Sequence, residues 1–85
     1  MSQDIDEKPE FKKGKYKHFK GGIYEVLDVA CHSETQEWYV MYESQTRKVE
    51  GLPLLWIRPY KMFFENVTRE GKTFPRFTYI GETKL

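Results

Sequence analysis

The chain has 85 residues, of which 39% are hydrophobic and 16% are aromatic, which is enough for one small core and too little for two. Fourteen Lys and Arg residues stand against 13 Asp and Glu residues, and this net charge of +1 excludes the strong basic bias of a histone-like protein. No apolar run approaches the ~18 residues of a membrane span. The acidic N-terminus lacks the apolar stretch of a secretion signal, and the single cysteine cannot form an internal disulfide. We therefore expect one small domain in the cytoplasm.

The first ten residues differ in composition from the rest. They carry four acids against one lysine and contain little apolar surface, so ordering them would gain little against chain entropy. We expect residues 1–10 to form a disordered, disposable acidic tail. Residues 11–85 should then form a single β domain.

Most of the remaining chain has the pattern of short strands. Residues 16–19 follow a glycine and precede a pair of glycines, and side chains in an extended segment alternate between faces. Residues 23–31 are apolar at both odd and even positions, which predicts a long strand that bends and buries opposite faces in its two halves. Residues 38–43 alternate and predict a third strand. Residues 32–37 between these strands are polar and predict a turn.

The second half continues the pattern. Residues 44–53 predict a polar loop, and residues 54–58 predict a fourth strand that ends at Pro59. Residues 60–65 can hold one helical turn with Met62 and Phe63 as its apolar contacts, residues 70–72 predict a turn, and residues 77–80 predict the last strand.

Five short strands and one helical turn predict an all-β fold. Curling the sheet into a barrel would remove its unpaired edges, so we expect a small SH3-like barrel, with an OB-like barrel as the second choice. The centres of the four best strand segments place Val26, Val40, Ile57 and Phe77 in the core.

Several strings of the chain, taken in order, resemble one known family. They are GKYKHFKG at 14–21, YEV at 24–26, HSET at 32–35, VMY at 40–42, LWIRP at 55–59, MF at 62–63 and PRFTYI at 75–80. Together they resemble the short, mostly bacterial family called domain of unknown function 1653. The resemblance implies one compact β domain and no agreed activity. Cys31 stands where that family usually has a basic residue, and the loop at 44–53 differs in detail.

The polar string His32, Ser33, Glu34 and Thr35 has two interpretations. Its side chains can bond the amides of a turn, or they can take part in a ligand site. Arg58 ends the fourth strand, where an arginine commonly bonds a carboxylate, and we expect Glu34 to be its partner. We expect His18, residues 32–35 and Arg58 to meet at one end of the barrel and form an anion-receptive corner.

Aromatic and basic residues suggest two other surfaces. Tyr42 and Trp56 can line a groove for an extended peptide or a cationic group, although such rings are more often core. Five lysines (Lys12, Lys13, Lys15, Lys17 and Lys20) alternate with aromatic residues, which suits single-stranded nucleic acid, although lysines on a strand edge also discourage edge pairing.

Enzyme and metal chemistry, which would draw on His18, Cys31, His32 and Glu34, have the least support. The sequence has no phosphate-binding glycine loop, nucleophile elbow or paired metal-ligand motif, and Cys31 and His32 should face opposite sides of a strand. We expect no catalytic residues, metal or cofactor, and a monomer that does not bind membranes. The preferred function is a non-enzymatic binding module for a peptide, a protein or a small anionic ligand, with RNA or single-stranded DNA as the alternative. The candidate ligand-binding residues are His18, Lys20, His32, Ser33, Glu34, Thr35, Tyr42, Trp56 and Arg58.

Overall fold

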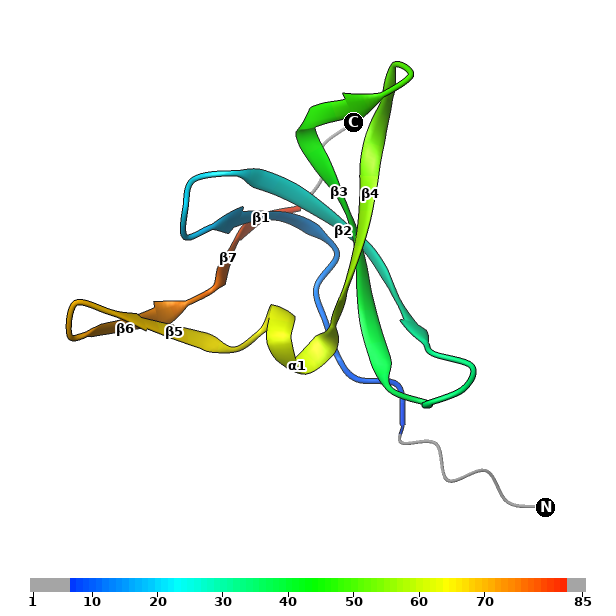
Figure 1. Ribbon diagram of the computed structural model, residues 1–85, viewed down its shortest axis with the longest axis horizontal. Coiled ribbons are helices and arrows are strands. Elements are labelled where there is room, and N and C mark those ends of the chain that lie inside the picture. The colour runs from blue at the N-terminus through cyan, green and yellow to red at the C-terminus, as the bar shows by residue number, and fades with distance from the viewer. Residues whose placement is uncertain (1–6, 83–85) are drawn as a thin grey trace.

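The computed structural model describes residues 7–82, which form seven strands and one short helix (Figure 1). In chain order these are β1 (Gly14–His18), β2 (Ile23–Cys31), β3 (Trp38–Val49), β4 (Leu52–Pro59), α1 (Tyr60–Phe63), β5 (Asn66–Arg69), β6 (Lys72–Pro75) and β7 (Phe77–Gly81). The expectation of an all-β domain with one short helical turn is confirmed.

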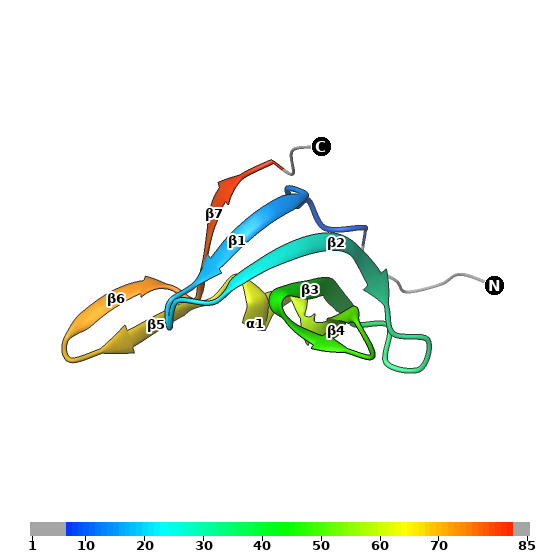
Figure 2. The ribbon, with the colours of Figure 1, turned by 90° about the horizontal axis from the view of Figure 1, so that it is seen from above.

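Five strands form one antiparallel sheet in the order β4-β3-β2-β1-β7, and β5 and β6 form a separate hairpin. The five-stranded sheet contains all five strands expected from the sequence. Figure 2 shows that this sheet is strongly bent, with α1 on its concave side. Within the described residues, the outer strands β4 and β7 do not pair with each other, so the sheet stays open and the expected barrel closure is not formed.

The bend in β2 has a local cause. The register between β2 and β3 shifts between Val26 and Asp28, so that Leu27 is an extra residue on one strand. Because of this shift Val26 and Val29, which lie three positions apart, are both buried on the same side of the sheet. The apolar residues at both odd and even positions therefore signal this irregularity, whereas the expectation that the two halves bury opposite faces is wrong.

The core lies on the concave side. Val26, Val40 and Phe77 are at most 5% exposed, as expected from the sequence, and they pack with Tyr16, Val29, Tyr42 and Phe63. The expectation for Ile57 is wrong, because its side chain is 63% exposed. Side chains alternate along β4, so Ile57 and Leu55 face outward while the neighbouring Trp56 and Arg58 face inward.

The helix α1 supplies the largest fully buried side chain. Phe63 is 0% exposed, and its ring stacks on that of Phe77 with 4.0 Å between the ring centroids. Met62, the other apolar contact expected of this helical turn, is 43% exposed. A helix of one turn buries only one side of itself, and Phe63 occupies that side.

Two hairpins lie in segments where the sequence predicted a loop or no secondary structure. Residues 44–53 continue β3 and β4 into a long hairpin whose turn is formed by Glu50 and Gly51, both with positive φ. The turn expected at residues 70–72 is present, but it joins β5 and β6, two strands that the sequence analysis did not predict. Figure 1 shows the β5–β6 hairpin projecting from the body of the domain.

Part of the expected tail contacts the sheet. The Tyr60 hydroxyl donates a hydrogen bond of 2.6 Å to the backbone carbonyl of Glu10, and Lys8 forms an ion pair of 3.6 Å with Asp28. The pKa of Asp28 is lowered by the hydrogen bond from the Val29 amide and further by the charge of Lys8. Residues 1–6 of the expected tail lie outside the described residues. In residues 7–82 no helix has the length and apolar character needed to cross a membrane.

Candidate functional site

His18 ends β1 on the concave side of the sheet. It shares this face with Tyr16, while Lys15 and Lys17 point to the other face, as strand alternation requires. The backbone N–H of Lys20 donates to His18 Nδ1 at 3.1 Å, so the neutral imidazole carries its proton on Nε2. The ring stacks on Phe19 and meets the ring of Phe77 edge to face, with centroid distances of 4.5 and 4.8 Å. His18 therefore has a fixed orientation, and within residues 7–82 its Nε2–H donor has no hydrogen-bond acceptor.

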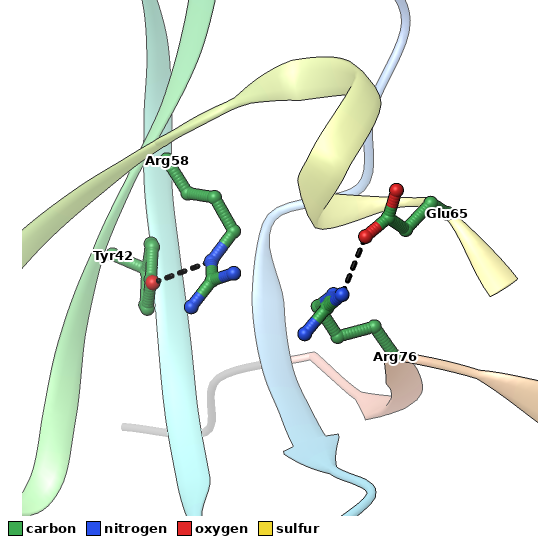
Figure 3. A network of polar contacts seen from close by, with 4 residues as sticks. All are labelled: Tyr42, Arg58, Glu65 and Arg76. Atoms are coloured by element: carbon green, nitrogen blue, oxygen red, sulfur yellow. Dashed lines mark hydrogen bonds and ion pairs between the residues drawn. The ribbon is translucent and has the colours of Figure 1, made fainter. Parts of the chain in front are cut away.

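Arg58 reaches the same aromatic ring from β4. Its Nε donates to the Tyr42 hydroxyl at 3.2 Å, and its guanidinium carbon lies 5.8 Å from the centroid of Phe77 (Figure 3). The ion pairs found within residues 7–82 are Lys8–Asp28 and Glu65–Arg76, so Glu34 is not the partner of Arg58. With Nε held by Tyr42, the two terminal nitrogens of Arg58 have no carboxylate partner in this part of the chain.

Arg76 approaches from the opposite side. It lies between β6 and β7, its backbone N–H donates to the Glu65 carbonyl at 2.9 Å, and its Nη2 forms an ion pair with the Glu65 carboxylate. Figure 3 shows the side chains of Arg58 and Arg76 extending toward each other from β4 and from the start of β7. We call His18, Arg58 and Arg76 the basic corner.

The positive charge of the basic corner affects the pKa of its histidine, His18. The pKa of His18 is lowered from 6.5, first by burial and then by the positive charges of Arg58, Arg76 and Lys20. One of these cations, Arg76, is paired with an acid, and the others add repulsion to a third positive charge. The corner therefore holds excess positive potential that an incoming anion would relieve.

The loop at residues 32–35 lies elsewhere. His18 lies beside the start of β2 and His32 follows its end, so the nine residues of β2, at most roughly 30 Å at the usual rise per residue, lie between them. His32 Nδ1 accepts hydrogen bonds from the amides of Glu34 and Thr35, and the Thr35 hydroxyl accepts one from the Glu37 amide. These are the contacts of a self-contained turn, so His32, Ser33, Glu34 and Thr35 are not brought to the basic corner.

The two aromatic candidates sit on the concave face as cross-strand neighbours. Tyr42 is 3% exposed, and its hydroxyl holds Arg58. Trp56 is half-buried, with the Arg47 guanidinium 5.6 Å from its ring centroid, and its buried Nε1 has no partner in the described residues. Tyr42 is therefore part of the core and positions Arg58, whereas Trp56 lies beside Arg47, a residue that the sequence analysis did not consider.

Three lysines of the expected strip line two different grooves. Lys12 and Lys13 line a groove that also contains the acids Glu25 and Glu82, and Lys12 lies 5.0 Å from the Tyr79 ring centroid. Lys17 lines a second groove together with Phe19. Tyr16 is buried, with its hydroxyl donating to the Lys12 carbonyl, so it is not available for base stacking.

Residues 7–82 contain no group of three or more His, Cys, Asp or Glu side chains that could hold a metal ion. Cys31, His18, His32 and Glu34, the residues considered for this role, are therefore not gathered at one place. Cys31 is half-buried, and its thiol contacts the His32 carbonyl at 3.8 Å.

Sequence reasoning missed Arg76 and its partner Glu65. A signal was present, because Arg76 and Phe77 belong to the string PRFTYI that closes the family resemblance. That string was used only to recognise the family and to predict the last strand. Glu65 lacked such a signal, because its role depends on the β5–β6 hairpin that folds Arg76 back onto it.

Comparison with known proteins identifies the family. Residues 14–79 match the family described as "Protein of unknown function (DUF1653)". The fold is similar to the crystal structure of a DUF1653 protein from Bordetella bronchiseptica, with a TM-score of 0.75, 33% sequence identity and coverage of 89% of this chain and 95% of that chain. The search of curated proteins found no match. The family match spans most of the chain, including His18, Arg58 and Arg76, and the chain belongs to the DUF1653 family.

Proposed function

We propose that this domain is a non-enzymatic binding module for a small ligand, or the end of a peptide, that carries a carboxylate or phosphate group. The observation that carries the proposal is that the Arg58 guanidinium is held in place but has no carboxylate partner. Its Nε is fixed by Tyr42, and its two terminal nitrogens have no acid within residues 7–82. A guanidinium fixed in this way presents two parallel N–H donors, the geometry that binds an oxyanion in bidentate fashion.

The rest of the basic corner supports the same ligand class. His18 offers its Nε2–H, and the positive charges of Arg58 and Arg76 already act on its ring. Like charges held together without compensation destabilise the free protein, and a bound anion would remove that repulsion. The aromatic rings below are packed into the core, which suits binding by a charged group rather than deep burial of an apolar ligand.

Binding of inorganic phosphate and of acetate tests the proposal. Titrations followed by NMR should shift the Arg58 Nε–H and His18 ring signals for at least one of these anions, and the two arms distinguish phosphate from carboxylate. Arg58→Gln removes the charge and should weaken binding by roughly ten-fold, as expected for one charge-assisted hydrogen-bond pair. Arg47→Gln, which removes an arginine over Trp56, is the matched control and should bind like the wild type.

The protonation of His18 adds a pH test. An anion favours the imidazolium form, so affinity should rise as the pH falls toward the pKa of His18 in the free protein, which lies below 6.5. Equal affinity of Arg58→Gln and wild type for both anions would exclude the basic corner as the site. We also propose that the domain acts in the cytoplasm, as expected from the sequence.

A further inference from the structure

Basic residues gather where β1 ends and the β5–β6 hairpin begins. Residues 15–22 and 66–78 together contain six Lys and Arg residues and one acid, Glu70, a net charge of +5. Because the whole chain is +1, the other residues carry −4. The two segments are in contact, since the Phe19 amide donates to the Arg76 carbonyl at 3.0 Å. The modest total charge of the chain therefore includes two contacting segments with an excess of basic residues, of which Arg76 is paired with Glu65.

Two half-buried phenylalanine rings lie in the middle of this surface. Phe19 and Phe74 contact each other with 5.6 Å between ring centroids. They line a groove that we call the hairpin groove, whose lining residues are Lys17, His18, Phe19, Phe74, Pro75 and Thr78. Lys17 points to the opposite face of β1 from His18, whereas Phe19 lies in the turn after β1 and its ring stacks on that of His18. The hairpin groove thus adjoins the basic corner and shares His18 with it, whereas Arg58 and Arg76 do not line the groove.

The cations are placed around these rings. The Arg69 guanidinium lies 5.1 Å from the Phe19 ring centroid, and the Lys20 ammonium lies 5.8 Å from it. In the hairpin, the cross-strand pairs Val67–Phe74 and Arg69–Lys72 are two positions apart and share one face. Lys72 and Arg69 therefore flank the groove on the face that carries Phe74.

We propose that the hairpin groove binds single-stranded nucleic acid. Unpaired bases would stack on the rings of Phe74 and Phe19, and Lys17, Lys20, Arg69 and Lys72 would contact the phosphates. Groups of this kind, rings in a basic groove, are what sequence-tolerant binding of single strands requires. An acidic peptide would use the cations but has no need of the two rings, and a duplex hides its base faces in its own stack. The rings therefore favour a single strand over both.

Fluorescence anisotropy with labelled oligouridylate and oligothymidylate of about 12 nucleotides tests the inference, at salt concentrations of about 50 and 200 mM. Both single strands present bases and phosphates, and the two arms show whether RNA or DNA is preferred. We expect binding that weakens with salt, with little competition from the matching duplex or from polyglutamate of similar charge. Absence of single-strand binding at the lower salt, or equal competition by duplex or polyglutamate, would overturn the inference.

Two kinds of variant distinguish the contribution of base stacking to affinity from the contribution of positive charge. Phe74→Leu should weaken binding by roughly five-fold or more without changing the salt dependence, and Phe74→Tyr, which keeps the ring, should bind within about two-fold of the wild type. Arg69→Gln and Lys72→Gln should each reduce the slope of log affinity against log salt by about 0.7. Lys48→Gln and Lys61→Gln remove exposed lysines from the β3–β4 hairpin and from α1 and should change neither property. Melting temperatures verify that each variant is folded.

If Phe74→Leu binds like the wild type, the rings do not stack on bases and the inference fails. If Phe74→Leu does not fold, the salt slopes of Arg69→Gln and Lys72→Gln decide. Slopes equal to those of the two lysine controls would then reject this surface. Binding of phosphate at the basic corner is tested on Arg58, which does not line the hairpin groove, so either proposal can fail without the other.

Discussion

The imidazole of His18 meets the ring of Phe77 edge to face, with 4.8 Å between centroids and 80° between the ring planes. Phe77 in turn stacks on Phe63, the fully buried residue of α1, and the Arg58 guanidinium lies over its ring. One aromatic ring of the core therefore supports both a histidine and an arginine of the basic corner. The protonation of His18 is consequently coupled to the stability of the fold.

The first prediction concerns this coupling. Burial, followed by the charges of Arg58 and Arg76, lowers the pKa of His18 in the folded state below its ordinary 6.5. The unfolded chain then binds a proton first as the pH falls, so the contribution of this group is present above pH 6.5 and is lost below it. Urea unfolding at about pH 7.5 and 5.5 should show that His18→Gln reduces the loss of stability at the lower pH.

His32→Gln is the matched control, because it removes an exposed histidine of the turn at the other end of β2. We expect the His32 variant to retain the wild-type change in stability between the two pH values. If His18→Gln and wild type lose equal stability on acidification, His18 is not coupled to the fold in this way.

The sequence was sufficient to predict the sheet because its strands carry strong local signals. The apolar residues at both odd and even positions of β2 indicated its irregularity. The alternation of Trp38, Val40 and Tyr42 indicated the inward face of β3. The β5–β6 hairpin carries no such signal. Its exposed pairs, such as Thr68 opposite Thr73, contribute little apolar periodicity on which a prediction could rest.

The site was only partly predictable for a different reason. Strand alternation correctly placed His18 on the inward face, and the position of Arg58 before Pro59 indicated a special role. Which strand ends meet depends on register and topology, and these place His32 and Glu34 at the far end of β2. Arg76 reaches the corner through a tertiary contact with Glu65 that no local pattern encodes.

A second prediction uses the difference between two aliphatic residues of neighbouring strands. Val40 in β3 is 0% exposed, whereas Ile57 in β4 is 63% exposed. Val40→Ala removes buried methyl groups and should lower the free energy of unfolding by about 1–3 kcal/mol. Ile57→Ala removes more atoms but from the surface and should change it by about 0.5 kcal/mol or less. Denaturant unfolding compares the two, and a larger loss for Ile57→Ala would contradict the assigned faces of β4.

A third prediction concerns the ion pair that ties the start of β7 to the segment after α1. The Arg76 and Glu65 side chains are 23% and 40% exposed, so their interaction is partly shielded from solvent. A double-mutant cycle with Arg76→Gln and Glu65→Gln should give a coupling energy of about 0.5–1.5 kcal/mol. The same cycle on Arg58 and Glu34 should give a value near zero, because these residues do not meet. Coupling of Arg58 to Glu34 as large as that of Arg76 to Glu65 would contradict the placement of the residue 32–37 turn.

The last prediction concerns how much the N-terminal residues contribute to the stability of the domain. The hydrogen bond from the Tyr60 hydroxyl to the Glu10 carbonyl links the N-terminal segment to α1, and it is exposed. Removing residues 1–6, which are acidic and nearly without apolar side chains, should leave the melting temperature unchanged. Removing residues 1–10 also deletes the acceptor carbonyl and the exposed ion pair of Lys8 with Asp28, which contributes little. One exposed hydrogen bond contributes about 0.5 kcal/mol, which is roughly 2–4 °C in a domain of this size. Tyr60→Phe in the full chain removes the donor instead and should produce a similar decrease. If the chain without residues 1–10 melts at the wild-type temperature while Tyr60→Phe does not, Tyr60 stabilises the domain through another contact and the segment before Phe11 is dispensable.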